Sequence, residues 1–100
     1  MYYLYILYSI SSNLYYVGHT DNYARRLVEH NTSERITYTS KHRPWKLMAV
    51  YYCGAERSEA LKIERHVKKQ KSKSFIERLV QEDVHSGLLA QLVRVPIFRD

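Results

Sequence analysis

Apolar and aromatic residues gather in three short segments, and each segment is typical of a β-strand. Residues 2–8 (YYLYILY), 14–19 (LYYVGH) and 46–52 (KLMAVYY) are rich in the branched and aromatic side chains that favour strands. A polar turn signal at 9–13 (SISSN) separates the first two. We therefore expect an antiparallel hairpin, followed later by a third strand that ends at Gly54.

Helical periodicity predicts two helices around that third strand. Residues 22–31 carry a helical stripe of apolar side chains, and Asp21 or Thr20 is suited to cap its start. Residues 56–70 form the second helix, and its apolar face carries Ala60, Ile63 and Val67. Residues 32–45 are polar and basic, which is typical of a loop.

The C-terminal part of the chain is harder to assign. Ser74 and Glu77 have the spacing of a capping box, which predicts a last helix over 74–83. After Gly87 the sequence is apolar again (LLAQLVRVPIF), and it fits a short helix, an added edge strand or a partner contact equally well. We expect one domain over 1–85 and a tail of unknown role over 86–100.

The order strand, strand, helix, strand, helix, helix predicts an α+β fold. We expect a small three-stranded antiparallel sheet flanked by helices. The 100 residues carry a formal net charge of +6, which favours a polyanionic partner such as nucleic acid. A single cysteine excludes an internal disulfide, and no segment has the length of a membrane span, so we expect a cytoplasmic protein.

Glu64 breaks the apolar pattern of the helix over 56–70. It falls between Ala60 and Leu61 on the helical wheel, where a carboxylate is costly unless it is paired or holds a metal ion. A slightly rotated helix, with Glu64 at the edge of the apolar stripe, explains the pattern without a functional site.

Arg26 and His30 are four residues apart and therefore share one face of the first helix. An arginine at the margin of an apolar stripe can bind a phosphate through two parallel hydrogen bonds. A solvated arginine beside a packed histidine is the alternative. Gly18, near the end of the second strand, is typical either of a close approach by another group or of a bulge.

Basic residues outside these positions are candidates for contacts to a nucleic-acid backbone. Lys41 and Arg43 lie in a loop that also carries Trp45, and such basic, aromatic loops contact phosphates and bases. Lys68 and Lys69 follow on the helix over 56–70. Solvated side chains are the alternative for both groups. The sequence contains no P-loop, no dinucleotide-binding glycine motif and no His-x-x-x-His zinc spacing.

Taken together, these residues resemble the GIY-YIG nuclease domain over about residues 2–83. Tyr3-Leu4-Tyr5 matches the first family triplet, and Tyr16-Val17-Gly18 matches the second. Three single residues match the family's catalytic arginine, its frequent histidine and its metal-binding glutamate, namely Arg26, His30 and Glu64. The stretches RPW at 43–45 and ALKIE at 60–64 are most similar to the small bacterial branch of the family.

The sequence departs from the family pattern at two positions of these motifs. Tyr3 replaces the first glycine, whose role is to make backbone room rather than to perform chemistry. His19 stands where many members carry a lysine, and it can still donate a hydrogen bond to a phosphate or carry a proton. The domain that selects the target in larger family members has no counterpart here, so a targeting protein partner is an open alternative.

The resemblance implies a metal-dependent endonuclease that hydrolyses phosphodiester bonds, with DNA expected over RNA and DNA repair or recombination as its setting. Glu64 would hold one Mg²⁺ or Mn²⁺, Tyr16 would bind or activate water, and Arg26 would neutralise the phosphate. Tyr5 would position water or phosphate, and His30 would orient these groups. Two alternatives remain: a nucleic-acid-binding module of the same fold without turnover, or an interaction domain that uses the apolar tail.

Overall fold

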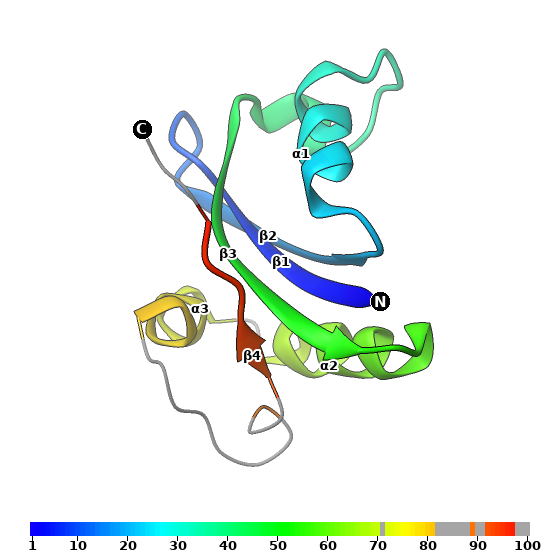
Figure 1. Ribbon diagram of the computed structural model, residues 1–100. Helices are drawn as coiled ribbons and strands as arrows, with labels where there is room; N and C mark the ends of the chain where they lie inside the picture. The colour runs from blue at the N-terminus through cyan, green and yellow to red at the C-terminus, as the bar shows by residue number, and fades with distance from the viewer. Residues whose placement is uncertain (71, 82–88, 90–91, 98–100) are drawn as a thin grey trace.

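A computed structural model describes residues 1–70, 72–81, 89 and 92–97 of the chain. It contains the strands β1 (Tyr2–Ser9), β2 (Leu14–Thr20), β3 (Trp45–Gly54) and β4 (Val93–Arg94). The helices are α1 (Tyr23–Thr32), α2 (Arg57–Lys69) and α3 (Lys73–Gln81), with a short 3₁₀ helix, η1 (Thr39–His42), in the loop before β3 (Figure 1). None of the described helices is long and apolar enough to cross a membrane.

The strands form one antiparallel sheet in the order β2-β1-β3-β4. The predicted α+β class and the predicted hairpin are confirmed, and the strand count is corrected from three to four. The fourth strand comes from the apolar tail, where Val93 and Arg94 pair with Tyr52 and Tyr51 of β3. A two-residue strand is too short for a sequence pattern to distinguish from a helix or a loop.

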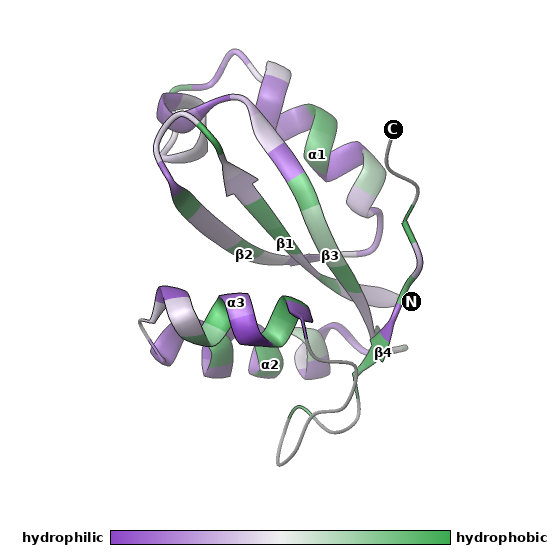
Figure 2. Cartoon of the chain, turned by 90° about the vertical axis from the view of Figure 1, so that its left-hand side faces the viewer, coloured by the Kyte–Doolittle hydropathy of each residue, from purple (hydrophilic) through white to green (hydrophobic). Residues whose placement is uncertain are grey.

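The sheet is covered on both faces, which explains why β1 is buried along four consecutive residues (Figure 2). Leu4 and Ile6 pack with α2 and α3, whereas Tyr5 and Leu7 face the side that α1 covers. Successive side chains of a strand point to opposite faces, so a central strand between two layers has no polar face.

The described part of the apolar tail packs on its own domain. Leu89 and Leu92 are buried in the cluster formed with α2 and α3, and Val95 and Ile97 pack against the cluster on the other face. The remaining residues of the predicted tail, and the predicted end of the last helix at 83, lie outside the described residues.

Two predicted helix caps are wrong by one or two positions. Asn22, rather than Asp21 or Thr20, caps α1, because its side-chain oxygen accepts a hydrogen bond from the backbone N–H of Arg25 at 3.0 Å. Ser72, rather than Ser74, accepts the corresponding bond from Phe75 at the start of α3. Serine, threonine, aspartate and asparagine all cap well, so neighbouring candidates cannot be ranked by residue type.

Candidate active site

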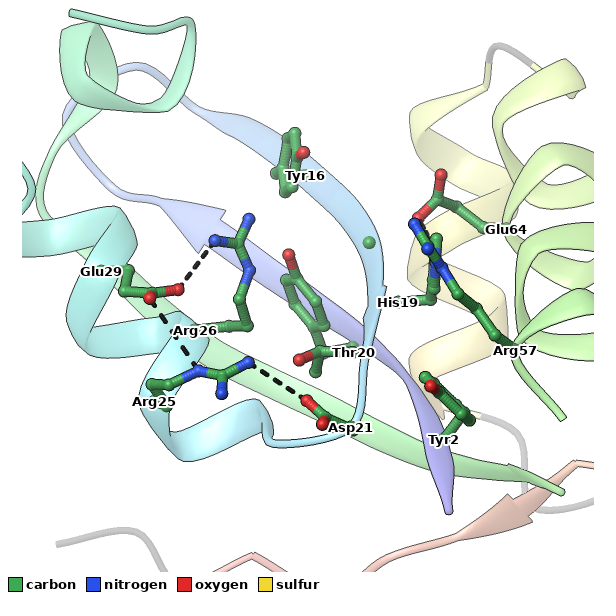
Figure 3. A pocket seen from close by; sticks show the side chains of 12 residues that line it. Tyr2, Tyr16, His19, Thr20, Asp21, Arg25, Arg26, Glu29, Arg57 and Glu64 are labelled. Atoms are coloured by element: carbon green, nitrogen blue, oxygen red, sulfur yellow. Dashed lines mark hydrogen bonds and ion pairs between the residues drawn. The ribbon is translucent and has the colours of Figure 1, made fainter. Parts of the chain in front are cut away.

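An open polar cleft of about 650 Å³ lies along β2, one of the two edge strands of the sheet. Because β2 has a partner on one side only, residues from both faces of the sheet can meet around its free edge. Figure 3 shows α1 on one side of this cleft, with Arg25, Arg26 and Glu29, and Arg57 and Glu64 of α2 on the other side. The cleft is lined by Tyr2, Tyr5, Tyr16, Gly18, His19, Thr20, Asp21, Arg25, Arg26, Glu29, Arg57 and Glu64.

Tyr5 and His30 form a buried hydrogen-bonded chain at the base of the cleft. Tyr5 Oη lies 2.8 Å from His30 Nε2, and His30 Nδ1 lies 3.0 Å from Thr39 Oγ1. Arg26 Nη2, which can only donate, is 3.5 Å from the same Nε2. The tautomer that suits all three contacts carries its proton on Nδ1, so Tyr5 donates to His30 and His30 donates to Thr39.

The electrostatics of this chain keep both rings uncharged at neutral pH. Burial raises the pKa of Tyr5 to about 12, and Arg26 only partly opposes this rise. Burial, with the nearby charge of Arg26, lowers the pKa of His30 to about 4. Tyr5 is therefore a fixed, neutral hydrogen-bonding group rather than a base.

Gly18 provides the space that the ring of Tyr5 occupies. Gly18 is opposite Tyr5 in the β1–β2 register, and a Cβ on Gly18 would lie 2.3 Å from Tyr5 Oη and 2.5 Å from Cζ. Any side chain at this position would push the Tyr5 ring away from His30.

Tyr16 differs from Tyr5 although both come from the central hairpin. It is half-buried and lines the cleft, and among the described residues its hydroxyl makes no hydrogen bond. The ring packs edge-on against His30 at 5.0 Å between centroids, and Lys68 Nζ lies 5.2 Å from the Tyr16 centroid. Of the two tyrosines, Tyr16 is the one with a hydroxyl left for a ligand or a water molecule.

Arg26 reaches the cleft from α1 and is held in place by Glu29. Arg26 Nη1 donates to Glu29 Oε1 at 2.8 Å, and this bond lowers the pKa of Glu29. The guanidinium carries five N–H donors, so this contact leaves donors for an anion in the cleft. Arg25 also pairs with Glu29, at 3.9 Å, and with Asp21 at 3.1 Å.

Glu64 reaches the cleft from the middle of α2. Its side chain is 14% exposed, beside the fully buried residues Ala60 and Ile63, so it lies at the edge of the apolar stripe. Glu64 Oε1 accepts a hydrogen bond from His19 Nδ1 at 2.9 Å, and Oε2 lies 3.3 Å from Lys68 Nζ. These two partners offset the cost of removing the carboxylate from water.

Arg57 fixes the orientation of His19. Its Nε donates to His19 Nε2 at 3.2 Å, so the remaining proton of a neutral His19 ring lies on Nδ1 and is donated to Glu64. Arg57 was not predicted from the sequence, although it precedes Glu64 by two helical turns and therefore shares its face. Glu29 was missed as well, despite lying three residues after Arg26.

The donor set of the cleft suits one type of metal ion. No group of three His, Cys, Asp or Glu side chains within the described ranges is arranged to hold a metal. Zinc, which takes three or four protein ligands, does not fit this arrangement. Mg²⁺ keeps several waters and needs only one or two carboxylates, so Glu64 fits a largely hydrated, hard cation.

The other predicted nucleic-acid contacts are not all brought to the cleft. Lys41 and Lys69 are exposed and lie outside its lining, on η1 and α2. Arg43 is half-buried, and its guanidinium donates to His30 O at 2.6 Å and to Ser33 O at 2.7 Å. Arg43 thus ties the C-terminal end of α1 to the loop before β3, and its predicted phosphate contact stays a prediction.

Comparisons with known proteins identify the family of this chain. Residues 1–78 match the model of the GIY-YIG catalytic domain. The UPF0213 protein lmo0166 of Listeria monocytogenes is 39% identical over 77 residues, which cover 76% of this chain and 83% of the relative. The UPF0213 protein lwe0147 of Listeria welshimeri is 36% identical over 77 residues, with the same coverage of both chains. With its two tyrosines, Arg26 and Glu64 gathered in one cleft, the chain belongs to the GIY-YIG family, a family of nucleases.

Proposed function

We propose that this protein is a metal-dependent endonuclease that hydrolyses phosphodiester bonds in nucleic acid, with DNA expected over RNA. One observation carries the proposal: Arg26 and Glu64, from helices on opposite faces of the sheet, line the same cleft as the hydroxyl of Tyr16. A cation-binding carboxylate opposite a phosphate-binding guanidinium is the arrangement that phosphodiester hydrolysis needs.

Glu64 would hold one Mg²⁺ or Mn²⁺ together with water molecules. When bound, the cation supplies positive charge that stabilises the phosphate and the departing oxygen. His19 Nδ1 holds Glu64 Oε1 at 2.9 Å, and among the described residues Oε2 contacts only the partly exposed Lys68 Nζ, so Glu64 is the residue that would hold the cation. Oriented partners of this kind fix the direction of a ligating carboxylate.

The remaining steps belong to the chain's own residues. Tyr16 would hold the attacking water through its free hydroxyl, while Tyr5, neutral and anchored on His30, would position the water or the phosphate. The water oxygen would bond to phosphorus and release a proton to solvent as the bond to the departing oxygen breaks, and the departing oxygen would take up a proton from solvent. The negative charge that develops on the phosphate faces the free donors of Arg26, which stabilise it.

An endonuclease assay with Mg²⁺ or Mn²⁺ tests the proposal, on single-stranded, duplex, flap and branched DNA and RNA. Glu64→Ala is expected to abolish metal-dependent cleavage and to leave binding largely intact. Arg26→Ala is expected to slow cleavage by roughly 100-fold or more, as for other losses of a transition-state hydrogen-bond donor.

Two matched variants serve as controls. Glu34→Ala and Arg78→Ala remove the same charges from exposed positions outside the cleft and are expected to cut like the wild type. The assignment of Glu64 is refuted if Glu64→Ala cuts as well as the wild type. A wild type that binds every substrate but cuts none would instead support a binding module without turnover.

A further inference from the structure

A second groove begins where the candidate active site ends. It has a volume of about 360 Å³ and lies between the free edge of β2 and the helices α2 and α3. Tyr16 lines both this groove and the catalytic cleft. A ligand that extends past Tyr16 from the cleft would therefore enter the groove. The groove is lined by Asn13, Leu14, Tyr15, Tyr16, Val17, Tyr38, Val67, Lys68, Ser72, Lys73 and Ile76.

The chemistry of the groove differs from that of the cleft. Its walls are mainly aromatic and aliphatic, whereas the cleft is lined mostly by charged and polar groups. Its size falls within the roughly 300–1,000 Å³ that is usual for small-molecule sites. An apolar, aromatic pocket beside a charged cleft suits a ligand with a flat, weakly polar part next to an anionic part.

Tyr38 is the most accessible ring of the groove. It is 53% exposed and lies 6.4 Å from Tyr16 between ring centroids, with 29° between the ring planes. The Tyr38 ring also packs against the His42 ring, with 4.9 Å between their centroids. Rings presented in this way provide platforms on which nucleobases stack, irrespective of sequence.

Two lysines add positive charge to the groove. Lys68 Nζ lies 5.2 Å from the centroid of the Tyr16 ring, and Lys73 Nζ donates to Asn13 Oδ1 at 2.6 Å. Among the described residues no acidic side chain lines the groove, and the nearest acidic partner of Lys68 is Glu64 of the cleft, at 3.3 Å. The positive charge of the groove therefore complements a phosphate that follows the base. Together with Arg26 of the cleft, the two lysines place positive side chains along both sites.

We infer that this groove is a nucleobase subsite: it binds the base of the nucleotide adjacent to the phosphate held in the cleft, by stacking on Tyr38 and Tyr16. This inference rests on the proposed function and extends it to a substrate class. A base can enter the groove only when it is out of a helical stack, so the favoured substrate has an unstacked nucleotide next to the cleaved bond.

The test measures binding without cleavage, in the absence of divalent metal. The probe is the shortest labelled DNA oligonucleotide that the wild type binds, either intact or with one abasic position moved along the strand. At one position, loss of the base is expected to weaken wild-type binding by about 5- to 150-fold, which corresponds to the usual contribution of one stacked base.

Variants of Tyr38 connect this loss to the groove. Tyr38→Ala is expected to weaken binding of the intact oligonucleotide by a similar factor and to remove the effect of the abasic position. Tyr38→Phe keeps the ring and is expected to behave like the wild type. Ile36→Ala is the matched control, since Ile36 lies in the same loop, is 87% exposed and does not line the groove.

The outcomes separate this inference from the proposed function. If the abasic position weakens binding by Tyr38→Ala as much as it weakens binding by the wild type, or if no abasic position changes binding, the groove does not hold a base. The inference then fails, while cleavage by the wild type still supports the proposed function. A wild type that neither binds nor cuts any nucleic acid refutes both.

Discussion

Replacing Gly18 with alanine tests whether the cleft depends on the position of Tyr5. The added Cβ would lie 2.3 Å from Tyr5 Oη and 2.5 Å from Cζ, far inside van der Waals contact. Tyr5 is only 2% exposed and its ring end lines the cleft, so either β2 must shift or the ring must move toward the cleft. Such a shift breaks the 2.8 Å hydrogen bond to His30.

The expected cost follows from these two effects. Overpacking a core position costs about 1–3 kcal/mol, and loss of a buried hydrogen bond adds about 1 kcal/mol. The free energy of unfolding of Gly18→Ala should therefore fall by about 2–4 kcal/mol. With a urea m-value of about 2 kcal/mol/M, the middle of the usual range for small proteins, the unfolding midpoint is expected to drop by about 1–2 M. Cleavage should fall as well, measured under conditions where the variant is still folded.

Gly54→Ala is the matched control for this variant. Gly54 has a φ of +111°, and an added Cβ would meet nothing within 4 Å. Its replacement costs stability through backbone strain, of order 1–3 kcal/mol, without a clash in the cleft. Both variants should be less stable, but only Gly18→Ala should lose activity. The reasoning is refuted if Gly18→Ala unfolds at the wild-type urea midpoint and cuts at the wild-type rate.

Three further predictions concern groups that the structure buries fully or in part. Because burial lowers the pKa of His30 from 6.5 to about 4, this ring takes up its proton at a higher pH in the unfolded chain than in the folded one. The free energy of unfolding is therefore expected to fall by on the order of 3 kcal/mol as the pH falls from 6.5 to 4. Urea titrations of His30→Gln should lack this part of the pH dependence. Arg43→Lys cannot keep both charged hydrogen bonds to the carbonyls of His30 and Ser33, and a loss of about 1–3 kcal/mol is expected in the same assay. Tyr51→Phe removes the 2.8 Å bond to Leu79 O and should lower the free energy of unfolding by about 1 kcal/mol; an unchanged midpoint would contradict the role of that bond.

The main elements of the fold were predictable because each has a strong local signal. The β1–β2 hairpin, α1, β3 and α2 were placed within one or two residues of their observed bounds. The signals that failed were the weak ones: β4 has two residues, and its pairing with β3 depends on contacts across more than 40 positions. Pairings of that range have no local pattern in a sequence.

The site was predictable as a set of residues but not as a geometry. The spacing within α1 put Arg26 and His30 on one face, yet nothing in the sequence indicated that Tyr5 donates to His30 across 25 positions. The partnership of His19 with Glu64 crosses 45 positions and depends on how α2 packs against β2. Helix rotation of this kind is decided by packing of the whole core rather than by the residue itself.

The two charged groups that would bind ligands in the cleft already have partners of opposite charge, so each ligand would replace an existing partner. In the structure Arg26 is paired with Glu29, and Glu64 is paired with Lys68 on its outer side. The Arg26–Glu29 pair is partly exposed, and pairs of that kind contribute little to stability, so separating it opposes binding only weakly. Glu64 is only 14% exposed, so its carboxylate needs a positive partner in either state, Lys68 or the cation. In the proposed reaction Lys68 would give up its contact with Glu64 when the carboxylate holds a cation, and Arg26 would exchange Glu29 for a phosphate. The displaced Lys68, which already lies over the Tyr16 ring between the cleft and the groove, would then be free to pair with the phosphate backbone. Metal binding and nucleic-acid binding are thereby expected to favour each other, because the first ligand releases a charge that the second one uses.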